Sequence, residues 1–314
     1  MKISFVIPCY RSEKTIEIVI DEIRQRMSEM RAKGREDDYD IILVNDCSPD
    51  NVWSVIKTIS EENEDITGIC LAKNFGQHAA LMAGYAHATG DYVVSLDDDG
   101  QTPLDSLESL LDKLEEGYDV VYAYYKEVKQ NLFRRFGSEV AGLMGKICLD
   151  PPENLKASSF FIARKFIIDE VLRYKNAFPY VYGLILRTTK NISCVETKHR
   201  SRLVGTSGYS FRSLLSLWLN GFTAFSVKPL ELSAYLGILL SIIGFFYTIF
   251  IVIRRILHPE IQAGWSSLIA IQLITSGVLM VMLGLVGEYI GRIYISINNS
   301  PQYVIKEIYK TSNK

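Results

Sequence analysis

The sequence predicts a mostly parallel α/β sheet domain that is followed by two membrane-spanning helices. Three observations support this prediction. Short apolar segments alternate with segments of helical periodicity over residues 1–200, two long segments without charge follow, and polar side chains gather where the apolar segments end. Hydrophobic residues make up 48% of the 314 positions, which is high for a soluble protein and suits a chain with a membrane part.

Five apolar segments are expected to form strands, with helices between them. Apolar and polar residues alternate little in these segments, so each strand is expected to be buried on both faces, as in a parallel sheet flanked by helices. The first domain is expected over residues 1–210. Its expected strands are "ISFVIP", "YDIILVND", "ITGICLAKN", "DYVVSLD" and "YDVVYAY", and its expected helices span residues 12–31, 51–62, 76–88 and 104–116.

Two segments, residues 232–253 and 265–287, carry no charged side chain. Each is long enough to cross a hydrocarbon core of about 30 Å as a helix. A pair of helices buried in a globular core is the alternative. We expect transmembrane helices over residues 232–253 and 265–290, joined as a hairpin that leaves both chain ends on one side of the membrane.

That side is expected to be the cytosol, because the N-terminal segment becomes polar too early for a signal peptide. Arg254 and Arg255, in the connection, argue against this orientation, whereas the charges at the other ends support it. We expect a multi-pass protein of the inner (plasma) membrane with a cytosolic tail at residues 291–314. The supporting charges are Arg200, Arg202, Arg212, Lys228 and Arg292.

Composition excludes two other classes. The formal net charge is −2, so the basic footprint of a nucleic-acid-binding protein is absent and we expect no nucleic-acid partner. The five cysteines show neither a CxxC pair nor a metal-ligand spacing, which suits reduced thiols in the cytosol.

Two further segments have one apolar helical face. They cover residues 132–148 and 211–229, and both contain or adjoin arginines. Ordinary core helices would show the same pattern. Beside membrane spans, however, the pattern favours interfacial helices that lie on the bilayer.

Polar residues follow four of the expected strands, at residues 8–13, 45–50, 73–78 and 97–101. In doubly wound sheets, ligands bind at the carboxyl ends of the strands. The sequence therefore predicts a ligand site at this edge of the sheet.

Asp97, Asp98 and Asp99 directly follow an apolar strand. Three adjacent carboxylates repel one another unless a cation is present, and Asp97 and Asp99 can point the same way. Two convergent carboxylates suit Mg²⁺ or Mn²⁺, which also bind phosphate oxygens. Such an ion would neutralise a nucleotide diphosphate. The alternative is a solvated acidic turn.

Asp46 and Glu13 also follow strands, and each has two interpretations. The Asp46 carboxylate could accept hydrogen bonds from a base or ribose, or cap the next helix, although Ser48 and Asp50 are better placed to cap. Glu13 could contact a nucleotide or stabilise the first turn of its helix.

Basic residues are candidates for binding phosphate, since arginine binds it in a bidentate manner. Arg134 and Arg135 begin the first amphipathic segment, and Arg202 precedes "GTSGY". Pairing with lipid headgroups is the alternative.

With these features together, the sequence resembles the polyisoprenyl-phosphate glycosyltransferases. These are family 2 glycosyltransferases related to dolichol-phosphate mannose synthase and to bacterial enzymes that load undecaprenyl phosphate. The resemblance covers nearly the whole chain. It is carried by "VIPCYRSE", "ILVNDCSPD", "KNFGQHAALMAGYAHATGDYVVSLDDDGQTP", "HRSRLVGTSGYS", "GFTAFSVKPL" and "GEYIGRIYISINNSPQYVI".

The resemblance implies a GT-A type, Rossmann-like domain and inverting transfer from a UDP- or GDP-sugar to a lipid phosphate, with Mg²⁺ or Mn²⁺ as cofactor. It implies that the tail reaches a neighbouring subunit in some members, so a homo-oligomer such as a tetramer is expected. It also implies site residues, which we assign as follows. The nucleotide-sugar site comprises Pro8, Tyr10, Glu13, Asp46, Lys73, Asp97, Asp98 and Gln101, and the metal ligands are Asp97 and Asp99. The lipid-phosphate site comprises Arg134, Arg135, Arg202 and Ser207. The catalytic residues are Asp98, Asp99 and Arg202.

The sequence departs from the family pattern in "LKASSFFIARK", where many relatives carry an aspartate assigned as a base. Here Ser158 and Ser159 stand without a carboxylate. A phosphomonoester, with a second pKa of about 6, is already anionic at neutral pH and needs little deprotonation. We therefore expect that no strong base is required, with Asp98 as the fallback.

The expected activity is transfer of one sugar, from a donor such as UDP-glucose, to undecaprenyl or another polyprenyl phosphate at the cytosolic membrane face. One alternative is a family 2 transferase that uses another lipid or a polysaccharide as acceptor. The other is a catalytically silent membrane scaffold that binds nucleotide-sugars.

Overall fold

The computed structural model describes residues 1–125, 151–152, 155–197, 228–257, 264–298 and 300–311. The chain divides into two compact units. Residues Met1–Ser216 and Asn299–Lys314 form the first unit, and Leu217–Asn298 form the second. The C-terminal segment thus belongs to the same unit as the N-terminal sheet.

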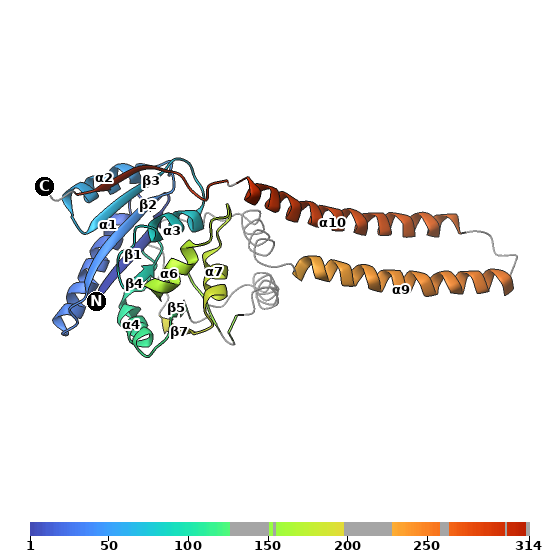
Figure 1. Cartoon of the computed structure of the whole chain (residues 1–314), viewed down its shortest axis with the longest axis horizontal. Helices are drawn as coiled ribbons and strands as arrows, with labels where there is room; N and C mark the ends of the chain where they lie inside the picture. Colours follow the sequence, from blue (N-terminus) through green and yellow to red (C-terminus); the bar gives the residue numbers. More distant parts are fainter. Residues whose placement is uncertain (126–150, 153–154, 198–227, 258–263, 299, 312–314) are drawn as a thin grey trace. The chain divides into compact units, whose positions relative to one another are not determined.

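One mixed sheet of eight strands organises the first unit (Figure 1). Strands β1 to β4 run parallel in the order β4-β1-β2-β3, which confirms the predicted parallel core. Strands β6 and β8 are antiparallel to their neighbours, so the sheet is mixed rather than mostly parallel at its two sides. The full order is β7-β5-β6-β4-β1-β2-β3-β8, with bounds β1 Lys2–Cys9, β2 Asp38–Asn45, β3 Ile66–Leu71, β4 Tyr92–Ser95, β5 Val120–Tyr125, β6 Phe161–Arg164, β7 Ile192–Thr197 and β8 Ile305–Lys310.

Helices cover both faces of this sheet, because successive strand residues point to opposite faces. Phe5 of β1 is buried in the core formed with α1, α2 and α4. Val6 points the other way, toward α3, and a Cβ on Gly84 would lie 2.3 Å from its Cγ1. Only glycine permits this close approach of helix to sheet. The helices are α1 Ile16–Ala32, α2 Val52–Glu62, α3 Gln77–Tyr85, a short 3₁₀ turn η1 Leu104–Ser106, α4 Leu107–Glu115, α6 Lys165–Leu172 and α7 Val181–Thr188.

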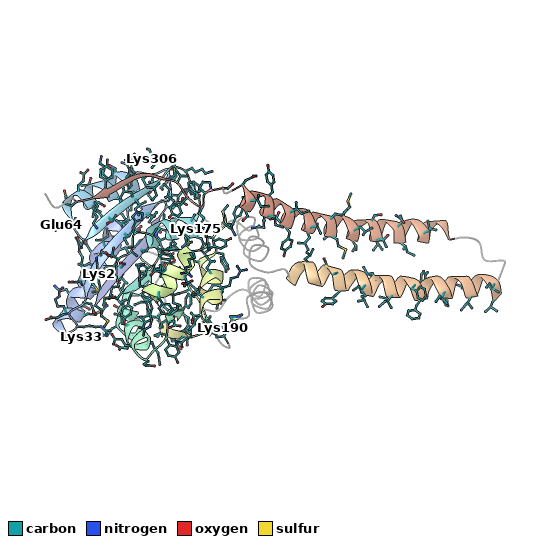
Figure 2. The ribbon with its side chains drawn as sticks, in the orientation of Figure 1. Lys2, Lys33, Glu64, Lys175, Lys190 and Lys306 are labelled. Atoms are coloured by element: carbon teal, nitrogen blue, oxygen red, sulfur yellow. The ribbon has the colours of Figure 1, made fainter. Side chains whose placement is uncertain are left out.

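Charged side chains lie mainly outside the apolar core. Lys33 and Lys306 are examples, with 57% and 61% of their side-chain surface exposed (Figure 2). The core residues between sheet and helices, such as Ile7 and Ile23, are fully buried. This division is what the apolar strand segments predict.

Pro8 lies within β1, although its position predicts the end of that strand. In a parallel strand, the N–H and C=O of one residue face the same neighbour, and Val6 C=O accepts from Leu96 on the β4 side. Pro8 therefore also faces that side, beyond Ser95, where the β1–β4 ladder has ended. Its missing N–H removes no ladder bond, so the proline is tolerated.

The C-terminal residues, expected as a tail, add a strand to the sheet of their own chain. β8, the dark red strand in Figure 1, pairs with β3 in the antiparallel direction. The Tyr309 ring meets the Trp53 ring of α2, with 5.8 Å between centroids, and the Lys57 ammonium lies 4.5 Å from its centroid. Gln302 Nε2 also donates to Tyr174 C=O over 2.6 Å.

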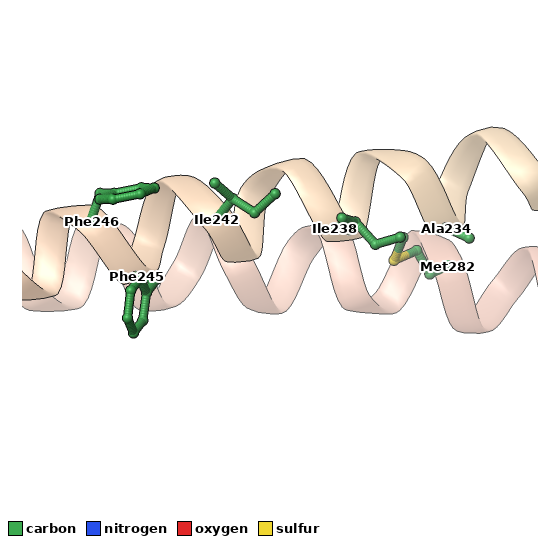
Figure 3. A pocket seen from close by; sticks show the side chains of 7 residues that line it. Ala234, Ile238, Ile242, Phe245, Phe246 and Met282 are labelled. Carbon is green, nitrogen blue, oxygen red and sulfur yellow. The ribbon is translucent and has the colours of Figure 1, made fainter.

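The second unit contains two long helices, α9 Lys228–Leu257 and α10 Trp265–Ile297. Within α10, Ile274–Ile297 is long and apolar enough to cross a membrane, with a mean hydropathy of 1.6, and none of that segment is buried. Among the described residues, Ser233–Tyr247 of α9 is a shorter apolar stretch. Figure 3 shows apolar side chains of α9 and Met282 of α10 lining a groove between the two helices.

Candidate active site

The site lies at the carboxyl ends of β1, β2, β3 and β4. The sheet order reverses between β1 and β4, since β2 and β3 continue on one side of β1 and β4 lies on the other. Ligands bind at such switch points in open α/β sheets. The predicted edge and the observed switch point therefore coincide.

Asp98 joins the two strand ends on either side of this switch point. Tyr10 N–H donates to Asp98 Oδ2 over 2.8 Å, and Thr15 Oγ1 donates to the Asp98 carbonyl over 2.6 Å. Burial raises the pKa of the Asp98 carboxyl to about 6; the Tyr10 amide opposes the shift and the charge of Asp97 adds to it. Asp98 is thus held by the scaffold.

Asp97 and Asp99 make different contacts from Asp98. Asp97 accepts from Gln77 Nε2 over 2.8 Å through Oδ1, and from the Ser159 hydroxyl through Oδ2. Asp99 Oδ1 accepts from the backbone N–H of Gln101 over 3.0 Å. All three aspartates are partly exposed. Each aspartate of the triplet thus has its own partners: Asp98 is bonded to the loop after β1, Asp97 to Gln77 and Ser159, and Asp99 to the Gln101 backbone.

Asp46 fixes the loop that follows β3. It is 4% exposed, and its two carboxylate oxygens accept from the Phe75 and Gly76 amides over 2.7 and 2.8 Å. Burial raises the pKa of Asp46, and the two amides oppose that shift. The observed partners thus belong to the β3–α3 loop rather than to the next helix. Lys73, in the same loop, places its ammonium 4.9 Å from the centroid of the Phe75 ring.

Glu13 and Asp50 interlock the loops after β1 and β2. The Glu13 amide donates to Asp50 Oδ2 over 3.0 Å, and the Asn51 amide donates back to Glu13 Oε2 over 3.3 Å. Asn51 is the N-cap of α2, so Glu13 supports the start of that helix. Arg11 and Cys47, in these loops, have φ angles of 60° and 48°, which are uncommon for residues other than glycine.

The remaining predicted residues are placed as follows. Tyr10 is 42% exposed at the end of β1, whereas Pro8 is buried. Arg134, Arg135, Arg202 and Ser207 lie outside the described residues. Gln77 and Ser159 contact Asp97 but are not among the predicted site residues. Gln77 lies in the family motif "KNFGQH", and Ser159 lies in the segment where many relatives carry an aspartate, so both segments had a signal in the sequence.

The donor set fits a divalent cation that completes its coordination with a ligand. Within the described part of the chain, no group of three or more His, Cys, Asp or Glu side chains could hold a metal. Mg²⁺ binds through one or two carboxylates together with waters and substrate phosphates, rather than in a closed protein cage. Asp97 and Asp99, partly exposed at the strand end, supply two hard oxygen donors of this kind.

Asp46→Asn tests the role of the loop contacts. The carboxamide keeps one acceptor but directs its NH₂ group at a second N–H donor, so one partly buried backbone amide loses its partner. We expect the free energy of unfolding to fall by about 2 kcal/mol. Urea unfolding of the variant and the wild type measures this change. Equal stability of the two proteins would show that Asp46 does not hold the loop.

Comparisons with known proteins identify the family of this chain. Residues 4–172 match the family described as glycosyl transferase family 2, and residues 228–293 match the GtrB C-terminal hairpin. The chain therefore belongs to glycosyl transferase family 2. A relative from Bacillus subtilis (strain 168), named uncharacterized glycosyltransferase YkcC, is 34% identical over 99% of this chain and 95% of its own.

Solved structures of lower identity are also similar. A glucosyl-3-phosphoglycerate synthase from Mycobacterium tuberculosis, in complex with Mn²⁺, UDP-glucose and phosphoglyceric acid, is 20% identical with a TM-score of 0.48, over 69% of this chain and 76% of that one. TarS from S. aureus, in complex with UDP-GlcNAc, is 17% identical with a TM-score of 0.47, over 71% and 66%.

Proposed function

We propose that this glycosyltransferase transfers one sugar, with inversion, from a UDP-sugar such as UDP-glucose to undecaprenyl or another polyprenyl phosphate at the cytosolic membrane face. One observation carries the proposal. The chain combines an acidic strand end at the β1/β4 switch point with a C-terminal segment that matches the GtrB hairpin. The first feature suits a nucleotide diphosphate, and the second suits a lipid-linked acceptor.

At the donor end, Asp97 and Asp99 would hold Mg²⁺ or Mn²⁺. When bound, the cation neutralises the diphosphate and stabilises the departing nucleotide. The exposed Tyr10 ring offers a surface on which a base can stack. Lys73 adds a positive charge on the loop that Asp46 holds. Pro8, Glu13, Asp98 and Gln101 complete the proposed nucleotide-sugar site.

At the acceptor end, an oxygen of the lipid phosphate attacks the anomeric carbon. The bond from that carbon to the diphosphate breaks, and the nucleotide leaves with the electron pair. The phosphate, with a second pKa of about 6, is already anionic, so no strong base is needed. Asp98 is the fallback base. Arg134, Arg135, Arg202 and Ser207 would bind the lipid phosphate, since arginine suits bidentate contacts to phosphate.

The second unit would anchor the enzyme in the inner membrane. The proposed hairpin consists of α9 and α10, of which Ile274–Ile297 has the length and composition of a span. Residues 132–148 and 211–229 would lie on the cytosolic surface and bring the lipid phosphate to the strand ends. The proposed assembly is a homo-oligomer, with a tetramer as one form.

The test is a transfer assay with membranes that contain the full chain. The membranes receive a labelled UDP-sugar, Mg²⁺ or Mn²⁺, and undecaprenyl phosphate, with diacylglycerol as the alternative acceptor. We expect a chloroform-soluble, acid-labile sugar product whose mass equals the polyprenyl phosphate plus one sugar. Membranes without the chain are the control.

The outcomes separate the three activities considered. A sugar product on diacylglycerol, or on a polysaccharide, would show that the enzyme uses an acceptor other than polyprenyl phosphate. Binding of UDP-sugar without any product, for every donor tested, would identify a silent scaffold and overturn the proposal.

A further inference from the structure

We propose that Gln77 and Ser159 are positioning residues for the Asp97 carboxylate. They hold its two oxygens in the orientation in which it binds the divalent cation and the diphosphate. This inference rests on the proposed function, because it concerns how one of the proposed metal ligands is kept in place.

Ser159 is aligned with Asp97 by the pairing of two strands. β4 and β6 are antiparallel, and Ser95 pairs with Phe161. Continuing this register by two residues places Ser159 opposite Asp97, and the Ser159 hydroxyl donates to Asp97 Oδ2. Side chains at opposite positions of an antiparallel pair lie within contact distance. The contact thus lies two residues beyond the end of the β4–β6 ladder, in the register that the ladder sets.

Gln77 holds the other carboxylate oxygen of Asp97. It is the first residue of α3, and its Nε2 donates to Asp97 Oδ1 over 2.8 Å. The two residues before it, Phe75 and Gly76, donate their amides to Asp46. Three consecutive residues thus connect the buried Asp46 to Asp97. A shift of this loop would displace the carboxylate.

The chemical type of these two side chains suits the role. Both are neutral hydrogen-bond donors, so they fix a carboxylate without adding charge or removing its own. A second carboxylate opposite Asp97 would repel it, since like charges at opposite positions destabilise a strand pair. Partners that orient a metal ligand typically change metal affinity by about 10- to 100-fold when they are removed. Because Ser159 and Gln77 are exposed, we expect the lower end of that range.

Ser159→Ala, Ser159→Thr, Gln77→Leu and Ser158→Ala in the full-length protein test the inference. Ser158 is the matched control, because its hydroxyl contacts the Ala123 carbonyl at 2.6 Å and lies on the adjacent position of the same segment. The first readout is Mn²⁺ affinity in the presence of UDP, measured by the electron paramagnetic resonance of free Mn²⁺. The second is sugar transfer as a function of Mn²⁺ concentration.

We expect Ser159→Ala and Gln77→Leu each to weaken Mn²⁺ binding by about tenfold. The transfer rate at saturating Mn²⁺ should change much less. Ser159→Thr should restore the affinity, because it restores the hydroxyl, and Ser158→Ala should bind Mn²⁺ like the wild type. Equal thermal unfolding temperatures of the variants exclude misfolding as the cause.

Two results would overturn the inference. One is unchanged Mn²⁺ affinity in both Ser159→Ala and Gln77→Leu, and the other is an equal loss in Ser158→Ala. Failure of the proposed function is distinguishable from both. A wild type that binds Mn²⁺ with UDP and yields no lipid-linked product rejects the proposed acceptor, while the Mn²⁺ affinities of the variants still decide the role of Ser159 and Gln77.

Discussion

Asp99→Asn is expected to lower the rate of sugar transfer by about a thousandfold, the upper range for removal of one group that stabilises transition-state charge. The neutral carboxamide is a poor ligand for Mg²⁺ or Mn²⁺, so charge on the departing diphosphate is no longer balanced. The Asn Oδ1 atom can still accept the Gln101 amide, which Asp99 Oδ1 accepts over 3.0 Å. The local backbone should therefore keep its conformation.

The measurement is the transfer rate at saturating donor and acceptor over a series of Mn²⁺ concentrations. Asp169→Asn is the control, because Asp169 lies on the exposed side of α6, where it pairs with Lys165. Exposed ion pairs contribute little to stability, typically about 0–1 kcal/mol, so this variant should transfer sugar normally. Full activity of Asp99→Asn with metal present would contradict the proposed metal role.

The parallel core and its ligand edge could be predicted from the sequence because they depend on local patterns. Apolar segments without alternation indicate strands buried on both faces, and the strand ends of a parallel sheet meet at one edge. The pattern predicts that residues 97–101 and 8–13 lie at the same edge of the sheet. In the structure, the hydrogen bond from Tyr10 N–H to Asp98 Oδ2 joins these two segments.

The antiparallel strands could not be predicted in the same way. β6 and β8 are short, and their places depend on pairing with β4 and β3, which lie far away in the sequence. The residues of β8 alternate between half-buried and exposed, as an edge strand requires, but six such residues are also typical of a polar tail. Long-range pairing leaves no local signal that distinguishes the two.

The roles of individual site residues depend on the same long-range geometry. A carboxylate at a strand end predicts hydrogen bonding, but only the fold shows that Asp46 accepts from Phe75 and Gly76. In the sequence, Ser159 stands in the segment where many relatives carry an aspartate. Only the register of β4 and β6 makes it a donor to Asp97. Residue type therefore indicated the chemistry, and strand pairing determined the partner.

His78→Phe is expected to stabilise the protein relative to the wild type increasingly as the pH falls. The imidazole of His78 packs edge-on against the Tyr180 ring, with 5.1 Å between centroids, and its Nδ1 is buried without a hydrogen-bond partner in the described structure. Burial lowers the pKa of His78 to about 4 from an ordinary 6.5. Phenylalanine can keep the ring contact and cannot take up a proton.

The sign follows from proton binding in the two states. Between pH 6.5 and 4 the unfolded chain binds a proton at His78 and the folded chain does not, so the free energy of unfolding falls as the pH falls. A shift of this size corresponds to at most about 3 kcal/mol, and partial exposure of the residue makes this an upper bound. Urea unfolding of the full-length wild type and variant at pH 7.5 and 4.5 measures the effect as the change in their difference. Because a desolvation effect is little screened by salt, this pH-dependent difference in stability should persist at high ionic strength. If the free energies of unfolding of the two proteins instead change in parallel with pH, His78 titrates as freely in the folded state as in the unfolded one.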